Sequence, residues 1–204
     1  DKEGLGGGGM SSYLEKIGRI RAHLALEGAA GAVLSTPDNV FYATGFSSVM
    51  DGWHLVEPIA AVFVPTDAAS PVILILPEAS VISPIVSERG GHPVYFDRLA
   101  TFDMLNFCET ARAEDAHLAL PNDLLAELGD VMEQVEGQCE PDIIQTIAAS
   151  LSRHVAKGER VLFDDLRVAG RVKALTGQAS GDALDVMFAA RAVKTANEID
   201  TLRE

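Results

Sequence analysis

The sequence predicts an α/β fold, a three-layer domain with a mixed, mostly parallel central sheet and helices on both faces. Short β-rich apolar runs alternate along the chain with longer segments in which apolar residues recur every three or four positions. The composition, with 48% hydrophobic and 23% charged residues, is that of an ordinary globular protein. Strands separated by helical crossovers are covered by helices on both faces, which gives the three layers.

The chain opens with a helix and a strand. Residues 12–27 carry apolar side chains on one stripe, and residues 32–34 form a short apolar run typical of a buried strand. A second, short helix is predicted over residues 38–44, with Thr36 as its cap, Pro37 in its first turn and Gly45 as its end.

The middle of the chain continues this alternation. Residues 46–56 show no period and are predicted to be an exposed loop. Residues 59–64 and 72–76 are predicted to pair as an antiparallel hairpin, and Pro84 must restart the helix that follows.

The helices and strands of the second half are predicted from the same two patterns, apolar residues every three or four positions and short apolar runs. Helices are expected in the segment that contains Phe102, Leu105 and Cys108 and over residues 122–135, 143–155 and 168–175. Strands are expected at 94–96, 117–120, 161–163 and 183–189.

Both ends of the chain carry local signals. Residues 1–9, before Met10, have the composition of an expression-tag remnant and are left out of the fold prediction. Thr195 and Glu198 form a capping box that begins a helix. That helix is too short to be stable alone, so we expect the natural polypeptide to continue beyond residue 204.

The charge balance restricts the possible partners. With 16 Lys and Arg against 30 Asp and Glu, the net charge of −14 excludes nucleic acid and anionic membranes as expected partners. Cys108 and Cys139 show neither a disulfide framework nor a zinc spacing, so two buried free thiols are expected. The first residues lack the basic-then-apolar order of a secretory signal and no stretch of 18 or more apolar residues occurs, so a cytoplasmic location is expected.

Two segments resemble one protein family. Asn39, Tyr42, Thr44, Gly45 and Phe46 match an N-x-x-Y-x-T-G-F pattern, and residues 191–203 match R-x-V-K-[ST]-x-x-E-I-x-x-[LM]-R. The sequence therefore resembles the N-terminal domain of the creatinase, prolidase and aminopeptidase P family of metallohydrolases. By this resemblance, residues 10–192 would form the domain, and residues 193–204 would begin a linker helix in which Lys194 and Glu198 are structural motif residues.

This resemblance implies that catalysis belongs to a different domain of the protein. In the family, two divalent metal ions (Mn, Co or Zn) are held by a C-terminal catalytic domain, so no metal ligand or catalytic residue is assigned to this chain. The resemblance implies a homodimer formed through this domain. It also implies that Trp53, His54, Asp51 and Phe46, in the loop after the motif helix, help to shape a substrate channel; the alternative for Trp53 and His54 is ordinary packing or solvent exposure.

Other interpretations of the residues remain open. The α/β alternation alone would also suit a free-standing Rossmann-like ligand-binding module, although the turn at residues 35–39 lacks the glycines of a dinucleotide site. Asp164 and Asp165 follow a strand and could face a metal, but capping the next helix is the simpler role. A hydrolase built on Ser47 or Cys108 lacks a positioned base.

Overall fold

The predicted α/β fold is confirmed. The computed structural model describes residues 7–48, 50–51, 57–104, 121–201 and 203. Within these residues a six-stranded mixed sheet has the order β4-β3-β2-β1-β5-β6. Its strands are β1 (Gly31–Leu34), β2 (Ala61–Pro65), β3 (Ile73–Pro77), β4 (Arg98–Phe102), β5 (Arg160–Phe163) and β6 (Ala179–Asp182).

The sheet combines a hairpin with parallel neighbours. β2 is antiparallel to β3, as predicted for the hairpin, and it is also antiparallel to β1. β4 is parallel to β3, β5 is parallel to β1, and β6 is parallel to β5. β1, β2 and β3 are buried along their whole length, because helices cover both of their faces.

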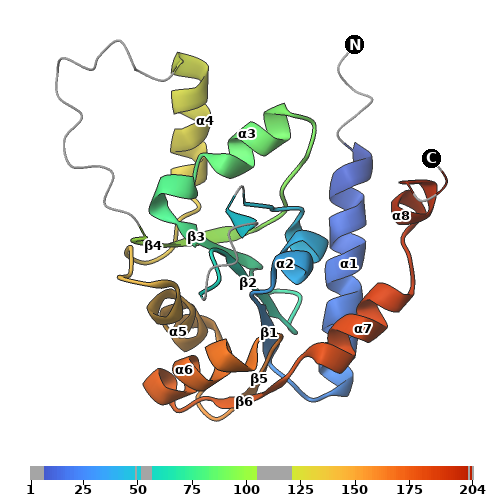
Figure 1. The fold of residues 1–204 in the computed structure, drawn as a ribbon, viewed down its shortest axis with the longest axis vertical. Helices are drawn as coiled ribbons and strands as arrows, with labels where there is room; N and C mark the ends of the chain where they lie inside the picture. The colour runs from blue at the N-terminus through green and yellow to red at the C-terminus, as the bar shows by residue number, and fades with distance from the viewer. Residues whose placement is uncertain (1–6, 49, 52–56, 105–120, 202, 204) are drawn as a thin grey trace.

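Helices form the outer layers (Figure 1). On one face lie α1 (Gly7–Leu26), α2 (Pro37–Thr44) and α7 (Leu184–Ala192), and on the other lie α5 (Ile143–His154) and α6 (Leu166–Thr176). Successive strand residues alternate between two apolar clusters: Ala32 and Leu34 pack with the first group of helices, and Val33 packs with the second.

Smaller elements complete the chain. After β3, a 3-10 turn (Glu78–Ser80) and α3 (Ser83–Arg89) lead towards β4, and α4 (Asn122–Met132) precedes α5. Pro84 lies in the first turn of α3, as expected for a restarted helix. The chain ends with α8 (Ala196–Thr201). Of the helices described, none is both long and apolar enough to cross a membrane.

Two predicted strands are wrong. Residues 94–96 form no strand, because the Tyr95 N–H donates to the Thr44 carbonyl of the neighbouring helix end. The strand instead begins at Arg98 and includes Phe102, which was predicted to be helical. Residues 183–189 lie almost entirely in α7: Leu184 and Phe188, 52% and 65% exposed, produce an apparent alternation on a helix.

One strand is missing from the prediction, one expectation is wrong, and others concern residues that the structure does not describe. β6 was not predicted, because Ala179–Asp182 carries no large apolar side chain and pairs with β5 through its backbone. Cys139 is exposed rather than buried. Leu105, Cys108 and the strand predicted at 117–120 lie outside the described residues.

Candidate functional site

The carboxyl ends of β1 and β5 form a crevice at the centre of the sheet. The two strands are parallel neighbours, but the helices that follow them lie on opposite faces. α2 follows β1 and packs into the first apolar cluster, whereas α6 follows β5 and packs into the second. Open α/β sheets bind ligands at this kind of switch point, where the chain leaves in opposite directions.

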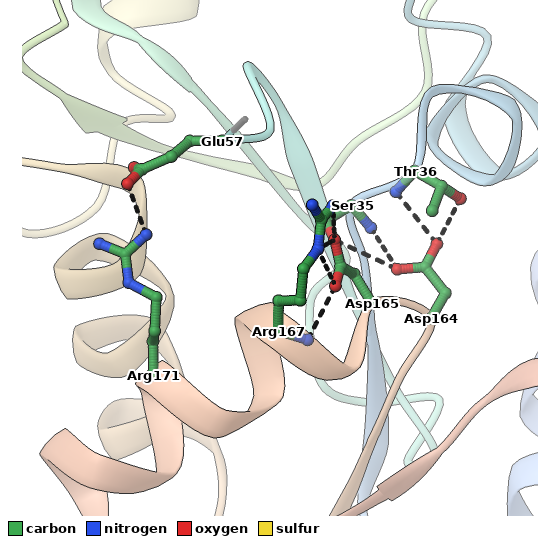
Figure 2. Close-up of polar contacts among 7 residues, drawn as sticks. All are labelled: Ser35, Thr36, Glu57, Asp164, Asp165, Arg167 and Arg171. Atoms are coloured by element: carbon green, nitrogen blue, oxygen red, sulfur yellow. Dashed lines mark hydrogen bonds and ion pairs between the residues drawn. The ribbon is translucent and has the colours of Figure 1, made fainter. Parts of the chain in front are cut away.

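Asp164, the first residue after β5, connects the two sides of this crevice by hydrogen bonds. Its Oδ1 accepts hydrogen bonds from the Ser35 N–H at 2.8 Å and the Ser35 hydroxyl at 3.2 Å. Its Oδ2 accepts from the Thr36 N–H at 3.1 Å, the Thr36 hydroxyl at 2.6 Å and Asn39 Nδ2 at 3.0 Å. Figure 2 shows the carboxylate turned towards the Ser35–Thr36 turn. Asp164 therefore joins β5 to the start of α2.

Thr36 does not act as expected. It occupies the N-cap position of α2, but its side chain makes no capping hydrogen bond. The hydroxyl donates to Asp164 instead, because that charged acceptor lies beside it. The predicted cap is right in position and wrong in its chemistry.

The two motif segments meet in space. Arg191 Nη1 donates to Asn39 Oδ1 at 3.0 Å, and the Tyr42 hydroxyl donates to the Ala190 carbonyl at 2.8 Å. Since Asn39 also donates to Asp164, one amide side chain links α2, α7 and the end of β5. Asn39 and Tyr42 thus connect α2 to α7.

Asp165 caps α6, which is the simpler of its two predicted roles. Its Oδ1 accepts from the Arg167 N–H at 2.8 Å, and both carboxylate oxygens accept from the Arg167 guanidinium. The hydrogen bonds from this guanidinium hold the pKa of Asp165 below its ordinary value, against the opposing effect of burial. One turn later, Arg171 pairs with Glu57, which precedes β2.

A pocket of about 200 Å³ opens at this crevice. Its walls come from the turn after β1, the start of α6, the segment before β2 and the residues around Met50. The lining residues that bear on its chemistry are Ser35, Thr36, Asp51, Glu57, Asp165 and Arg167. The pocket therefore has hydroxyl groups, three carboxylates and one guanidinium within a small volume.

A second hollow of about 390 Å³ lies beside the first. It is bounded by Glu57, Phe102, Asp103, Asp142 and neighbouring apolar residues. Asp142 is engaged as the cap of α5, where it accepts from the Gln145 N–H at 2.8 Å. This hollow thus offers few free polar groups to a ligand.

The predicted channel residues fall into two groups. Trp53 and His54 lie outside the described residues. Asp51 lines the pocket, and its Oδ2 accepts from the Ser48 N–H at 2.8 Å. Phe46 also lines the pocket, but it is only 3% exposed and belongs to the apolar core. The prediction of an exposed loop is therefore wrong at its first residue.

Gly45 ends α2 in a conformation that favours glycine. Its φ is 76°, and its N–H donates to the Phe41 carbonyl. An added Cβ would lie 2.3 Å from the Tyr13 hydroxyl oxygen and 2.8 Å from the Pro93 carbonyl oxygen. The motif glycine is thus required by both its backbone angle and its surroundings.

The predicted capping box of α8 is confirmed. The Thr195 N–H donates to Glu198 Oε2 at 2.7 Å, and the Glu198 N–H donates to Thr195 Oγ1 at 3.2 Å. Lys194, the preceding motif residue, donates through Nζ to the Arg191 carbonyl at 2.8 Å. The segment before α8 is also held on α1, where the Arg19 guanidinium donates to the Val193 and Lys194 carbonyls.

The pKa of Glu198 predicts how this helix start depends on pH. Burial opposes ionisation, but the hydrogen bond from Thr195 and the positive charge of Lys16 outweigh it, so the pKa lies below its ordinary value. Because the pKa is lower in the folded state, ionised Glu198 stabilises the capped helix at pH values above its unfolded-state pKa, which is near 4.3. This stabilisation is lost as the pH falls through the folded-state pKa.

We therefore expect the capping box to open in acid. Hydrogen exchange of the Thr195 amide should accelerate, relative to its intrinsic rate, as the pH drops below about 4. Glu198→Gln keeps an acceptor and removes the charge, so its relative protection should be nearly independent of pH over the same range. An equal acid response in both proteins would show that Glu198 does not hold the helix start.

Comparison with known proteins relates this fold to prolidases. No family model matches the chain, and a search of curated proteins finds no match. Among solved structures, prolidase from Thermococcus sibiricus matches 92% of this chain and 39% of its own, with a TM-score of 0.56 at 16% identity. The chain has the fold of part of a prolidase.

Further structures agree. Dipeptidase PepE from Mycobacterium ulcerans matches 94% of this chain and 39% of its own, with a TM-score of 0.53 at 18% identity. A proline dipeptidase chain from Streptococcus pneumoniae matches 88% of this chain and 98% of its own, with a TM-score of 0.50 at 20% identity. The chain thus spans less than half the length of the first two. The expected family resemblance is confirmed at the level of this prolidase fold.

The sequence did not reveal every residue at the crevice. The sequence predicts only a metal-facing or capping role for Asp164, and it indicates no role for Glu57, Arg167 and Arg171. The signal available for Asp164 was its place directly after a buried strand, because residues at the carboxyl end of a parallel strand point into the crevice. The pairing of Glu57 with Arg171 could not be predicted, because the two residues are 114 positions apart in the sequence and meet only in the folded chain.

Proposed function

We propose that this chain is the non-catalytic N-terminal domain of a dinuclear metallohydrolase that acts on Xaa-Pro peptides or on a creatine-like substrate. Its own C-terminal catalytic domain would be its first partner, and a second copy of the chain its other partner. Nucleic acid and membranes are not proposed as partners, because the net charge of −14 disfavours binding to both.

The observation that carries this proposal is the extent of the prolidase match. The match covers 92% of this chain but only 39% of the Thermococcus sibiricus prolidase. A larger protein built on the same plan would thus have room for a separate catalytic domain. The two converging motif segments, joined through Asn39 and Arg191, support the same assignment.

The metal chemistry is proposed for the catalytic domain. Such a domain would hold two divalent ions (Mn, Co or Zn) with Asp, His and Glu ligands, and the ions would polarise a carbonyl and activate water. Within the described ranges of this chain, no three His, Cys, Asp or Glu side chains are grouped so that they could hold a metal ion. These residues do not fit a metal site, and we assign them no metal-dependent step.

The role proposed for this chain is to form a homodimer and to limit access to the substrate channel. The loop that begins at Phe46 and contains Asp51, Trp53 and His54 would contribute to that channel. Asp51 supports this role, since it lines the pocket at the carboxyl ends of β1 and β5. Light scattering of the chain in solution measures whether it dimerises.

An activity assay tests the proposal. The chain alone, supplied with Mn, Co or Zn and a proline dipeptide, should give no turnover above that of the metal alone, because no described residues could activate water on a metal. Clear turnover would contradict a non-catalytic role. In the gene, an Asp, Asp, His, Glu, Glu ligand series downstream of residue 204 should be found.

One alternative has a specific observation in its favour. A free-standing ligand-binding module would also use a pocket at the carboxyl ends of β1 and β5. The turn after β1 nevertheless contains Ser35, Thr36 and Pro37 in place of the glycines of a dinucleotide site. A nucleotide is therefore the less suitable ligand.

A further inference from the structure

We propose that the pocket at the carboxyl ends of β1 and β5 binds a small zwitterionic amino acid with an apolar side chain. The position of the pocket is the first reason. It lies where α2 and α6 leave the sheet on opposite faces, which is the usual ligand position in α/β sheets. This binding site is independent of the metallohydrolase function proposed above.

The usual ligand of such a crevice is a phosphate, and here its place is already taken. The N–H groups just before α2 and in the first turn of α6 would otherwise attract an anion. Asp164 accepts from the Ser35 and Thr36 N–H groups, and Asp165 accepts from the Arg167 N–H. The pocket lining carries three carboxylates, Asp51, Glu57 and Asp165, against one guanidinium, so it favours a ligand with a positive group over a phosphate.

Two further carboxylates are positioned to receive an ammonium group. Asp51 and Glu57 line the pocket, and each is fixed through one oxygen, by the Ser48 N–H and by Arg171 respectively. In the described part of the chain, Asp51 Oδ1 and Glu57 Oε2 have no hydrogen-bond partner. A charged amine could bind them without breaking an existing contact.

A carboxylate on the ligand also has a partner. Arg167 lines the pocket and uses Nε and Nη2 to hold Asp165. Its Nη1 makes no hydrogen bond to the residues that the structure describes. Figure 2 shows that Arg167 and Arg171 both rise from α6 towards the end of β1 and the residues before β2. The pocket thus pairs acidic groups with one available guanidinium donor, which suits a zwitterion.

The remaining wall is apolar and small. Val40, Phe46 and Ile59 line the pocket and are 2%, 3% and 7% exposed. A volume of about 200 Å³ is below the range of roughly 300 to 1,000 Å³ typical of sites for drug-sized ligands. This space therefore suits a single amino acid with a side chain such as that of leucine.

Nuclear magnetic resonance titration tests the proposal on the chain as it stands. L-Leucine should shift the amide signals of Ser35, Asp51 and Arg167 and saturate with a dissociation constant on the order of 1 mM, as expected for a ligand of about nine heavy atoms. Isoamylamine lacks the carboxylate and isocaproate lacks the amine, so each should bind at least about tenfold more weakly. Asp51→Asn and Glu57→Gln should weaken leucine binding by a similar factor.

A control variant and competing ligands distinguish specific binding at this pocket from nonspecific association. Glu88→Gln, an exposed change on α3, should bind leucine like the unchanged chain. The proposal is overturned if leucine causes no saturable shift up to about 50 mM. It is equally overturned if isoamylamine binds as well as leucine, or if inorganic phosphate or AMP saturates the same signals. Because the analogue series uses the unchanged chain, the test does not depend on whether a variant folds.

Discussion

Replacing Asp164 by Ala should lower the free energy of unfolding by about 3 kcal/mol. The carboxylate accepts five hydrogen bonds, from Ser35, Thr36 and Asn39, at distances of 2.6 to 3.2 Å. Its removal leaves two backbone N–H groups at a partly buried turn without their acceptor. Losses of this kind cost more than the net value of the bonds, because unsatisfied donors remain dehydrated.

Asp164→Asn should be destabilising for a related reason. An amide has one oxygen and one NH₂ group, whereas all five surrounding groups donate to Asp164. At least one side of the amide would therefore place a donor against donors. In a chain of this length, a loss of 3 kcal/mol corresponds to a fall in Tm of about 10 °C.

Calorimetry or urea denaturation measures both changes. Asp130→Asn is the matched control, because Asp130 is exposed and its carboxylate makes no hydrogen bond within the described residues; it should change stability by less than about 0.5 kcal/mol. If Asp164→Asn proves as mild as this control, Asp164 does not join β5 to α2 in the way described.

The same site shows what the sequence could and could not predict. The N-x-x-Y-x-T-G-F pattern singles out Asn39 and Tyr42, and the structure shows that both side chains hydrogen-bond to distant parts of the chain. Their partners could not be predicted, because Asp164 and Arg191 lie 125 and 152 residues from Asn39. These contacts exist only once β5 pairs with β1 and both α2 and α7 pack against α1. The sequence pattern thus identifies Asn39 and Tyr42, but their hydrogen-bond partners depend on the topology of the fold.

The fold was predicted best where burial follows one period. The buried stripe of α5, with Ile143, Ile147 and Leu151, matches its sequence spacing. Prediction failed in α7, where exposed Leu184 and Phe188 disturb the helical period and imitate a strand. It failed again at β6, which is formed by backbone pairing with β5 and has little apolar signal.

Replacing Gly45 by Ala should lower the free energy of unfolding by about 2 to 4 kcal/mol. Two costs add at this position. A side chain at a φ of 76° strains the backbone by roughly 1 to 2 kcal/mol. The new Cβ would also lie 2.8 Å from the Pro93 carbonyl oxygen and 2.3 Å from the Tyr13 hydroxyl oxygen. Tyr13 can rotate away, but the Pro93 carbonyl belongs to the backbone and must be displaced.

Gly28→Ala separates these two costs. Gly28 has a similar φ of 61°, but nothing lies within 4 Å of the position of an added Cβ. This variant should therefore show only the backbone strain, a loss of about 1 kcal/mol. The difference between the two variants, measured by thermal or urea unfolding, gives the cost of the close approach. Equal losses in both would mean that the end of α2 tolerates a side chain, and that the motif glycine is needed for its backbone angle alone.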